Sequence, residues 1–482
     1  MPVTTAQPFS WQNPSADDAV MLAQLQPNIL KGHPRDFMTA VFVTIGNPAE
    51  AKAFFKALVQ PAAGTPLMKT ALKQLQEALA FKNAGTPGTV YVGVGITAAG
   101  YVALGVPAAK QPADPSFQAG MRSAAIQTKL VDPLKATFDP TFKGNIHAVI
   151  IVGDSTAQSR DATLATVKAL MPASMVEVGR EVGTGLHNAN GDGIEHFGYV
   201  DGRSQPLFLT EDVTDERLGT DGTNVWDPAF GPARVIVSDP GAQNPALHFG
   251  SYFVFRKLEQ NVKAFKTEED KLATRLGLTG ADAERAGAMI VGRFEDGTPL
   301  TNQLADGNHN PVPNNFNYGS DPNGAKQPFF SHIRKVNPRG SGGFEAEPQE
   351  RLHIMARRGQ TYGVRADNPN DGQLTNKPTK DVGLLFMAFN ANIAQQFEFA
   401  QSTWANNATF PAVPAGFPAP GLDLVIGQIK PGPRPQPRCP VTWGADPNVP
   451  AQNKTVIAPV QTVTLKGGEY FFMPSLATLA AL

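Results

Sequence analysis

The chain has 482 residues, of which 41% are hydrophobic and 17% are charged, and its formal net charge is −1 at pH 7. This length predicts two or three domains, and the composition is that of a globular chain, which excludes wholesale disorder and fibrous repeats. Because positive charge is not in excess, nucleic acid is not an expected partner. The single cysteine, Cys439, excludes an internal disulfide, a cysteine zinc site and haem attachment through a CxxCH motif.

The sequence contains no run of about 18 apolar residues, so we expect no membrane-spanning segment. The first 18 residues have neither the basic nor the apolar region of an export signal, so a cytoplasmic location is expected. The 46 glycines and 42 prolines predict many turns. The 29 phenylalanines, against 7 tyrosines and 4 tryptophans, fit either a large apolar cavity or a phenylalanine-rich core.

Strand patterns followed by helix patterns occur twice in each half of the chain. In the first half the strands are Phe37–Ile45 and residues 146–152, and the helices are PAEAKAFFKAL and residues 157–171. In the second half the strands are residues 249–256 and 384–389, and the helices are KLEQNVKAFKTEEDKLATRL and residues 393–404. This recurrence predicts an α+β fold of duplicated ferredoxin-like βαββαβ units, in which helices pack on antiparallel sheets.

We place the boundary between the two units after residue 244, so that residues 1–244 form the first unit and residues 245–482 the second. Three stretches rich in glycine, proline and polar residues connect the elements, at residues 209–244, 306–327 and 411–453. The second is too long for a plain connection and predicts a functional or covering loop. Residues 469–473 form the last predicted strand.

The stretch YVGVGITAAG, residues 91–100, has a glycine pattern after a strand, as in dinucleotide-binding folds. Its third glycine position is alanine and no acidic residue lies about 20 positions further on, so a turn is the better interpretation.

None of the eight histidines is spaced as HxxxH or HExxH, which removes support for a zinc hydrolase. His332 differs from the others in its surroundings, FFSHIRKVNPRG, where Arg334, Lys335 and Arg339 follow it closely. A histidine on a short helix beside guanidinium groups suits an axial ligand of a cofactor with anionic propionates. The alternative is an ordinary surface or core histidine.

Two further segments carry candidate functional groups. In HFGYVDGRSQP, glycines flank Asp201, which indicates a tight loop that presents the carboxylate; a common Asp-Gly turn is the alternative. In RLHIMARRGQTYG, Arg357 and Arg358 end an apolar run, and one of them can project into a cavity. In an extended run the two side chains face opposite sides, so only one of them can do so. A solvated arginine pair is the alternative.

Taken together, these segments resemble a known family. FGYVDGRSQP resembles the GxxDG signature of the dye-decolourising peroxidases, haem enzymes with a duplicated ferredoxin-like fold. HIRKVNPR and ARRGQTYG resemble the proximal-ligand and distal-arginine segments of that family, and PNILKGHPRD and GGEYFFMPS are also similar to family stretches. The resemblance runs from about residue 25 to residue 482. The segments HIRK, RRG and QFEFAQ are similar to those of the longer, fungal and bacterial branch of the family.

The resemblance implies one haem b per chain, held between the sheet and the helices of the second half, with His332 as the proximal iron ligand. It implies that Asp201 is the distal acid–base residue and that Arg357 is the distal arginine, with Arg358 as the competing assignment. Leu384 and Phe386 alternate on one face of their strand, and the resemblance implies that they line the distal cavity.

The resemblance also suggests residues around this centre. Glu398 is expected to orient His332 through its second ring nitrogen, although it could be an exposed helix acid. Arg334 and Arg203 are the expected partners of the haem propionates. Bulky reductants cannot enter a narrow cavity, so surface aromatics are expected to carry electrons; the candidates are Tyr362 and Trp404, with ordinary packing as the alternative.

The implied activity is that of a haem peroxidase, which reduces hydrogen peroxide and oxidises dyes, phenols and other bulky aromatic reductants through a ferryl intermediate. Two alternatives stay open at this point: a haem-binding or haem-handling protein with incidental peroxidase activity, and a non-catalytic α+β binding module. Neither alternative needs Asp201 or Arg357, so their joint presence favours the peroxidase. The sequence indicates no particular oligomeric state.

Overall fold

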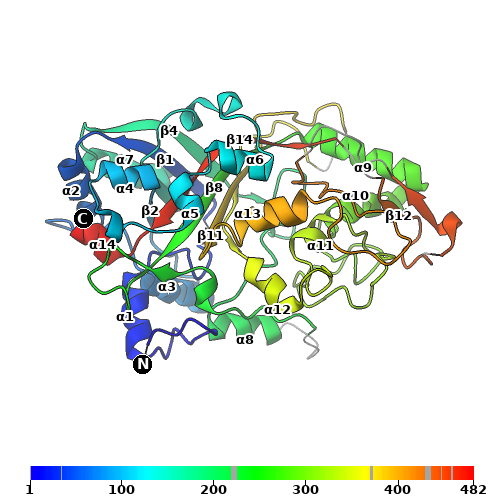
Figure 1. Cartoon of the computed structure of the whole chain (residues 1–482), viewed down its shortest axis with the longest axis horizontal. Helices are drawn as coiled ribbons and strands as arrows, with labels where there is room; N and C mark the ends of the chain where they lie inside the picture. Colours follow the sequence, from blue (N-terminus) through cyan, green and yellow to red (C-terminus); the bar gives the residue numbers. More distant parts are fainter. Residues whose placement is uncertain are drawn as a thin grey trace.

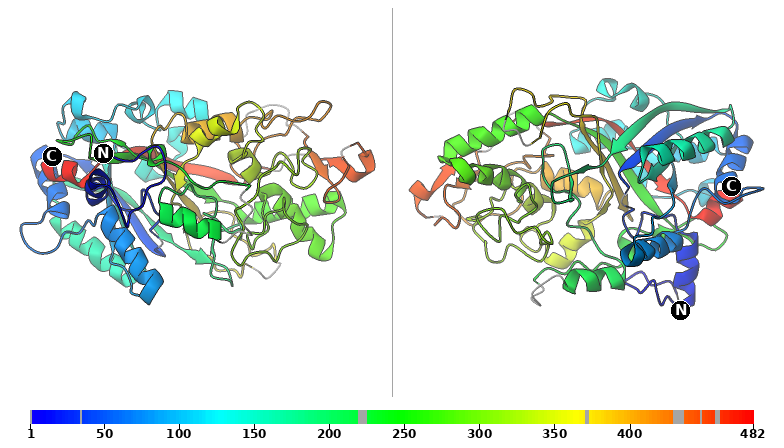
Figure 2. Two further views of the ribbon diagram at one scale, coloured as in Figure 1. Left: turned by 90° about the horizontal axis from the view of Figure 1, so that it is seen from below. Right: turned by 180° about the vertical axis from the view of Figure 1, so that it is seen from behind.

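The computed structural model describes residues 2–33, 35–218, 225–369, 373–428, 436–446, 448–456 and 460–482. Its centre is an antiparallel sheet with helices packed around it, and both termini lie at the end of the molecule formed by the N-terminal half (Figure 1). Most of the irregular segments and helices of the second half extend away from the sheet at the opposite end (Figure 2), whereas the last helix, α14 (Leu476–Ala481), lies beside the termini. The predicted α+β class is therefore confirmed.

Eight strands of the sheet form a closed ring. They are β1 (Phe37–Ile45), β2 (Tyr91–Ile96), β3 (Ala148–Asp154), β4 (Met175–Thr184), β8 (Phe249–Gln260), β10 (Gln360–Tyr362), β11 (Gly383–Asn390) and β14 (Val463–Met473). The strand order is β8-β14-β2-β3-β1-β4-β10-β11, and the ring closes because β11 also pairs with β8. Two short strands, β7 (Val237–Ser238) and β9 (Ala356–Arg357), are added to β8 and β11.

The duplication predicted from the sequence is visible in this order. The four strands of the first half follow the order β4-β1-β3-β2, and the four strands of the second half follow the equivalent order β14-β8-β11-β10. Each half thus has the strand order of a ferredoxin-like unit. The halves join where β2 meets β14 at Ile96 and Phe472, and where β4 meets β10 at Gly183 and Tyr362. The boundary after residue 244 stays a prediction.

Strand β1 illustrates why these segments are strands. Its sequence FMTAVFVTI is rich in β-branched and aromatic residues, and its side chains alternate between two apolar clusters. Phe42 packs edge-on against Phe142 and Phe255 in one cluster, at ring-centroid distances of 5.2 and 5.1 Å. On the opposite face, Val41 and Val43 belong to the cluster that includes the covering helices. Many of the phenylalanines therefore serve the core.

The helices of the first half pack mainly around its strands. They are α1 (Ala16–Gln24), α2 (Pro48–Val59), α3 (Ala71–Ala84), α4 (Ala98–Ala103), α5 (Pro115–Ala119), α6 (Ala124–Leu130), α7 (Ala157–Leu170) and α8 (Thr210–Leu218). Asn47 and Thr156 cap the N-termini of α2 and α7 by accepting backbone hydrogen bonds. The helix predicted over residues 157–171 is thus observed almost in full.

The helices of the second half are α9 (Val262–Leu276), α10 (Glu284–Val291), α11 (His332–Val336), α12 (Glu347–Glu350), α13 (Phe397–Phe399) and α14 (Leu476–Ala481). They include α9, which is long, several short helices near the site, and α14, which packs on α2. The helix expected over residues 393–404 is a shorter element: α13 continues as a π-helical segment, Ala400–Ala405. Gln396 accounts for the late start, because its side chain accepts the backbone N–H groups of Ala391 and Asn392 in a turn before the helix.

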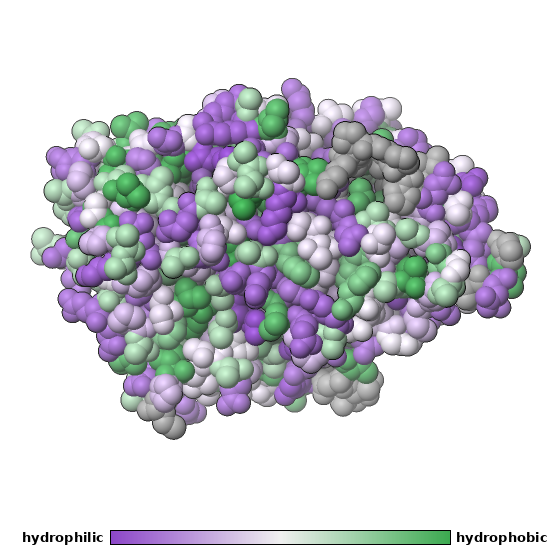
Figure 3. Space-filling model, in the orientation of Figure 1, coloured by the Kyte–Doolittle hydropathy of each residue, from purple (hydrophilic) through white to green (hydrophobic). Residues whose placement is uncertain are grey.

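Residues 306–327 contain no helix or strand, as predicted, and part of the stretch 411–453 lies outside the described residues. The described segments also form two minor ribbons: β5 (Leu186–His187) with β6 (Gly193–Ile194), and β12 (Arg438–Pro440) with β13 (Asn453–Thr455). Within the described ranges, no helix has both the length and the apolar character needed to cross a bilayer. On the face shown in Figure 3, hydrophilic and hydrophobic residues are interspersed.

Candidate active site

A cavity lies between strand β11 and the helices of the second half. Its wall includes the predicted residues His332, Asp201, Arg357, Leu384 and Phe386, which come from four separate places in the sequence. Much of the remaining wall is apolar and includes Val291, Ile333, Val336, Val425, Ile426 and Phe397. The fold therefore brings an imidazole, a carboxylate and a guanidinium group to one largely apolar space.

His332 begins the short helix α11 and faces this cavity. Its Nδ1 lies 2.7 Å from Oδ2 of Asp423, which leaves Nε2 for a ligand in the cavity. Asp423 is buried, and its other oxygen accepts the backbone N–H groups of Val425 and Ile426 at 2.8 and 2.9 Å. Burial alone would raise the pKa of Asp423, but His332 and these backbone groups hold it below its usual value. The carboxylate is thus held ionised behind the imidazole.

The prediction that Glu398 orients His332 is wrong. Glu398 is buried, but its carboxylate accepts from the Tyr470 hydroxyl at 3.0 Å and from Lys129 at 2.7 Å. Asp423, which lies 91 positions after His332, takes the place expected for Glu398. The sequence contained no local pattern that links Asp423 to His332, because the two meet only through the tertiary fold.

Asp201 and Arg357 lie together in another part of the cavity wall. Nη1 of Arg357 is 3.3 Å from Oδ1 of Asp201, and both side chains are about one-third exposed. The loop that carries Asp201 needs its glycines, because Gly198 and Gly202 have φ values of 105° and 80°. Asp201 and Arg203 also line an outer cleft, so the carboxylate stands between the interior cavity and the surface.

The choice between the two neighbouring arginines follows from their directions. Arg357 lines the cavity, whereas Arg358 points to the opposite side of the strand, where it donates to the carbonyl groups of Asn28 and Ile29. This is the alternation expected of an extended segment. The geometry therefore favours Arg357 as the group that acts in the cavity.

Strand β11 provides the apolar pair. Leu384 and Phe386 line the cavity, while Leu385 and Met387 between and after them are buried in the core cluster on the other face. The strand pattern thus predicted the facing of these residues correctly, and their role in the reaction stays a prediction.

Arg334 was predicted to bind a haem propionate, and this prediction is wrong. Its guanidinium group is buried and donates to the Asp321 carboxylate at 2.9 Å and to the backbone carbonyl groups of Gln327 and Asp321. It stacks over Tyr318 and Phe329 and does not contribute to the cavity wall. Arg203 does line the cavity, although its guanidinium group also forms two hydrogen bonds with Glu216, at 3.0 and 2.8 Å.

Two other arginines, Arg293 and Arg339, line the cavity near Arg203. In the described part of the chain, the hydrogen bonds of both go to backbone carbonyl groups, Ser204 and the Asn314 amide, and none goes to a carboxylate. Burial and the neighbouring Arg339 lower the pKa of Arg293 to about 9, and burial lowers that of Arg339 to about 10. The sequence analysis noted Arg339 in the basic cluster that follows His332. Arg293 belongs to no sequence motif that would have identified it.

Polar atoms without a partner lie beside these arginines. The Tyr318 hydroxyl and Oδ1 of Asn337 are buried, line the same cavity and have no hydrogen-bond partner among the described residues. Buried polar groups are normally satisfied, so such atoms in a cavity wall indicate a ligand with polar groups of its own. With two buried cations that lack a carboxylate partner, this end of the cavity suits an anionic ligand.

The proposed electron carriers are not at the surface. Trp404 is 1% exposed and Tyr362 is 6% exposed, so the expectation of surface aromatics is wrong for both side chains. The Trp404 ring lies edge-on to His353, which lines the cavity, and stacks on Phe410. Tyr362 lies in strand β10, with the Lys257 ammonium group 5.0 Å from its ring centroid.

Glu195 is a cavity residue that the sequence analysis did not identify. Its carboxylate accepts the backbone N–H groups of Phe197 and Tyr199, at 2.8 and 3.1 Å, and the side-chain N–H of Gln260. It therefore fixes the turn that leads to Asp201. Burial raises the pKa of Glu195 to about 7, although these hydrogen bonds act in the opposite direction.

The chain is similar to known proteins over its whole length. Residues 24–185 match the family model of the DyP dimeric alpha+beta barrel domain. Over 483 residues, the chain is 55% identical to the multifunctional dye peroxidase DyP2 of Amycolatopsis sp., with 100% of both chains covered. The solved structure of DyP2 matches with a TM-score of 0.94 at 54% identity and also covers 100% of both chains.

Two more distant relatives are also peroxidases of the dye-decolourising type. The dye-decolorizing peroxidase msp1 of Mycetinis scorodonius is 31% identical over 405 residues, which covers 80% of this chain and 75% of that protein. The structure of a DyP-type peroxidase of Anabaena sp. matches with a TM-score of 0.87 at 35% identity, covering 98% of this chain and 96% of the other.

The raised pKa of Glu195 predicts a pH-dependent stability. Because the folded protein binds the Glu195 proton more tightly than the unfolded chain does, this group's contribution to stability is complete below about pH 4.5 and is lost as the pH rises through about 7. Glu195→Gln removes this dependence. The free energy of unfolding of the variant relative to the parent should rise by about 3 kcal/mol across this window, from 1.36 kcal/mol per pKa unit. Urea unfolding of both proteins at several pH values measures it, with the exposed Glu347→Gln as control. A difference that does not change with pH would contradict the assignment.

Proposed function

Because the chain belongs to the dye-decolourising peroxidase family, we propose that its cavity binds one haem b per chain, with His332 as the iron ligand and with Asp201 and Arg357 acting on hydrogen peroxide. The chain is a peroxidase of the dye-decolourising type. Haem, when bound, supplies the iron at which peroxide is reduced and which then takes electrons singly from a reductant. The observation that carries the proposal is the convergence of the His332–Asp423 pair and the Asp201–Arg357 pair on one cavity.

The residues present fit a haem. An imidazole that faces an apolar space and is backed by a buried carboxylate is a common arrangement for a histidine that ligates iron or another metal. Arg293, Arg339 and the unpartnered Tyr318 hydroxyl would hold the propionates, which need cations and donors in a place largely removed from water. Arg203 is a further candidate at the edge of this group, and Arg334 is not.

Asp423 has a definite task in this arrangement. By accepting the Nδ1 proton of His332, the ionised carboxylate fixes the tautomer and the ring orientation, so that Nε2 carries the lone pair toward the cavity. It also makes the imidazole more basic and therefore a stronger electron donor to a bound metal. Replacing this carboxylate is expected to weaken the ligand without removing it.

Asp201 and Arg357 have different roles in the reaction with hydrogen peroxide. The Asp201 carboxylate accepts a proton from one peroxide oxygen and returns it to the other, so that water can leave. The guanidinium group of Arg357, whose Nη1 lies 3.3 Å from Oδ1 of Asp201, stabilises the negative charge that develops while the O–O bond breaks. A carrier of haem has no need for this pair, which is why the enzyme is the better interpretation.

Leu384 and Phe386 restrict what enters. Their apolar side chains border the space that Asp201 and Arg357 face. We propose that hydrogen peroxide passes from the outer cleft beside Asp201, whereas bulky dyes and phenols give up electrons elsewhere on the protein.

Trp404 is the better candidate for such an electron transfer. It is joined on one side to His353 in the cavity wall and on the other to Phe410, which stacks on Phe344 at 6.1 Å. Phe344 is 65% exposed, so this aromatic series spans from the cavity to the surface.

The ligand assignment predicts that His332→Ala loses most of its haem. Asp423→Asn should keep the ligand but bind haem about 10- to 100-fold more weakly, as is typical when a supporting partner of a ligand is removed. The measurements are the haem-to-protein absorbance ratio after haem supplementation and a haem-transfer titration. His187→Ala, in an exposed ribbon, is the control. A His332→Ala protein with normal haem content and an unchanged histidine-ligated spectrum would contradict the assignment.

The proton-transfer assignment predicts an acid-tolerant reaction with peroxide. Free aspartate and histidine side chains have pKa values of about 3.9 and 6.5, so a carboxylate base works at pH values where an imidazole base is protonated. Asp201→Asn should slow the reaction by about 100-fold or more, the usual contribution of a general base. Stopped-flow absorbance gives the second-order rate constant with peroxide against pH. Loss of the parent rate with an inflection near about 6.5, the histidine value, or a normal rate in Asp201→Asn, would exclude Asp201 as the base.

The electron-transfer proposal predicts a selective defect. Trp404→Phe should lose most activity on bulky dyes while keeping peroxide reduction and the oxidation of small phenols, because phenylalanine fills much of the space but is far harder to oxidise. Steady-state kcat/KM for a bulky dye, a small phenol and hydrogen peroxide gives the comparison, with Tyr362→Phe as the matched variant. Equal activity of the parent and Trp404→Phe on the dye would leave Trp404 a packing residue.

A further inference from the structure

The arginine assigned to the peroxide reaction lies on an edge strand of only two residues. In the described part of the chain, β9 (Ala356–Arg357) ends the sheet and pairs only with β11, through Arg357 with Ala388 and Ala356 with Phe389. An edge strand leaves peptide groups on its outer side without a ladder partner. So short a strand cannot by itself hold a side chain at a fixed position.

Two side chains bind the peptide groups of Arg357. Oε1 of Gln205 accepts the N–H of Arg357 at 2.9 Å, and Nη1 of Arg358 donates to its carbonyl oxygen at 2.9 Å. The N–H of Arg358 continues the ladder to the Met387 carbonyl at 2.7 Å. Gln205 follows Asp201 by only four positions, so it also links the loop of the carboxylate to the strand of the arginine.

Arg358 connects this strand to the N-terminal half. Its Nε donates to the carbonyl oxygen of Asn28 at 2.8 Å and its Nη2 to that of Ile29 at 3.1 Å. All three nitrogens of the guanidinium group thus donate to backbone carbonyl groups, two of them on a segment more than 300 positions away. We call residues 25–33 the N-terminal strap.

The strap has a specific shape. Asn28 has a φ of 72°, a left-handed conformation that asparagine tolerates better than most residues, and its Oδ1 accepts the N–H of His33 at 2.9 Å. Gln74 on helix α3 accepts the N–H of Asn28 at 2.7 Å and donates to the carbonyl groups of Lys31 and Gly32, both at 3.0 Å. The carbonyl groups that Arg358 binds are therefore held in place by α3.

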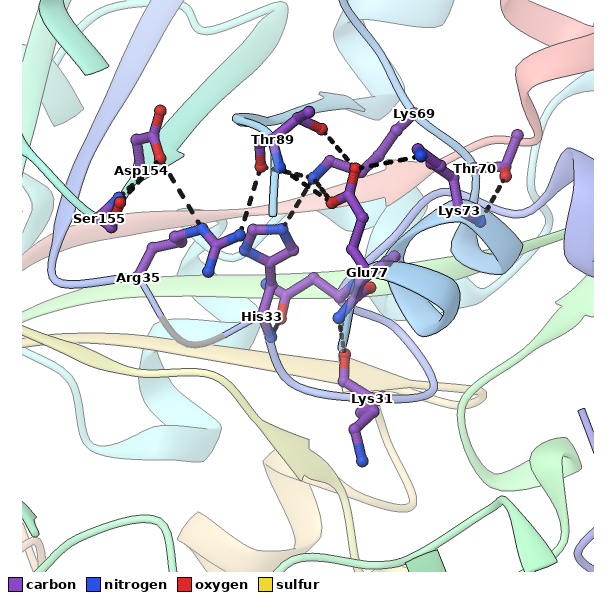
Figure 4. Close-up of polar contacts among 12 residues, drawn as sticks. Lys31, His33, Arg35, Lys69, Thr70, Lys73, Glu77, Thr89, Asp154 and Ser155 are labelled. Carbon is purple, nitrogen blue, oxygen red and sulfur yellow. Dashed lines mark hydrogen bonds and ion pairs between the residues drawn. The ribbon is translucent and has the colours of Figure 1, made fainter. Parts of the chain in front are cut away.

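The end of the strap rests on a network of charged groups (Figure 4). Nε2 of His33 lies 3.3 Å from the Lys69 ammonium group, which is paired with Glu77 at 2.6 Å and donates to the Thr89 carbonyl at 2.6 Å. The side chains of Lys69 and Glu77 are 6% and 10% exposed. Separating such a largely buried pair is costly, so Lys69 stays in place and the strap meets a fixed group through His33.

From these contacts we infer that Arg358 and Gln205 are positioning residues for Arg357, and that the N-terminal strap is the fixed point to which Arg358 ties it. The inference rests on the proposed role of Arg357 in the peroxide reaction. Arg358 itself does not line the cavity, so it acts only through Arg357. The inference gives the N-terminal PNILKGH segment a role in a site whose other parts lie elsewhere in the chain.

The test compares Arg358→Lys with Arg351→Lys in the haem-loaded protein. Lysine keeps the charge, but its donors all stand on one nitrogen, so it cannot reproduce the three guanidinium nitrogens that reach the carbonyl groups of Asn28, Ile29 and Arg357 separately. Arg351 is a matched control, because it also donates to two backbone carbonyl groups, those of Asp227 and Ala229, away from Arg357. We expect Arg358→Lys to lower kcat/KM for hydrogen peroxide about tenfold or more, in line with the sensitivity of catalysis to small misplacements. The kcat/KM of Arg358→Lys for the reductant and its haem content should stay unchanged. In Arg351→Lys, kcat/KM for hydrogen peroxide, kcat/KM for the reductant and haem content should all stay unchanged.

A second readout does not depend on activity. In haem-free protein, amide hydrogen exchange of the peptides covering residues 25–33 and 355–359 should become faster in Arg358→Lys and stay unchanged in Arg351→Lys. Gln205→Met, which removes only the acceptor of the Arg357 N–H, should accelerate exchange in the second peptide alone. This variant keeps the test decisive if Arg358→Lys folds poorly.

The outcomes separate the inference from the proposed function. If Arg358→Lys and Gln205→Met match the parent in peroxide kinetics and in amide exchange, the positioning role is overturned. If exchange changes but Arg357→Leu reacts normally with peroxide, the role proposed for Arg357 fails while the mechanical link stands. Equal losses toward peroxide and reductant in Arg358→Lys would indicate general damage and would also overturn the inference.

Discussion

The hydrogen bond between His332 and Asp423 is the interaction on which the rest of the site depends. A carboxylate buried behind an imidazole is stable only if other groups satisfy it, and here the backbone N–H groups of Val425 and Ile426 do so. The result is a ring with one nitrogen fixed and the other turned to the cavity. The other residues of the cavity wall can act on a ligand bound to His332 only because that nitrogen faces the cavity.

The closed sheet brings these residues together from distant parts of the chain. Strand β11 supplies the apolar wall, the two-residue strand β9 beside it supplies Arg357, and a glycine-dependent loop of the first half supplies Asp201. The two ferredoxin-like halves therefore do not have equivalent roles. The second half holds the imidazole and the basic end of the cavity, and the first half supplies the carboxylate together with the strap behind Arg358.

The sequence was informative wherever the relevant interactions are local. The strand Phe37–Ile45 was predicted with its observed bounds because its β-branched and aromatic run is unambiguous. The facing of Leu384 and Phe386 followed from the period of a strand. The partners of charged groups were not predictable in this way: Glu398 was expected beside His332, where Asp423 stands, and Arg334 was expected in the cavity but pairs with Asp321, because only the tertiary fold determines which buried charges meet. The burial of Trp404 likewise depends on Phe410 and on other residues that pack over it only in the folded chain.

The central claim is that His332, backed by the Asp423 carboxylate, binds the haem iron. Resonance Raman spectroscopy of the ferrous protein tests it most directly, because the iron–imidazole stretching band reports both the ligand and its hydrogen bond. The account predicts a band that shifts when the histidines are labelled with ¹⁵N and that moves to lower frequency in Asp423→Asn, since the weaker acceptor makes the imidazole a poorer donor. A band that is absent, or that is identical in the parent and in Asp423→Asn, would contradict the account.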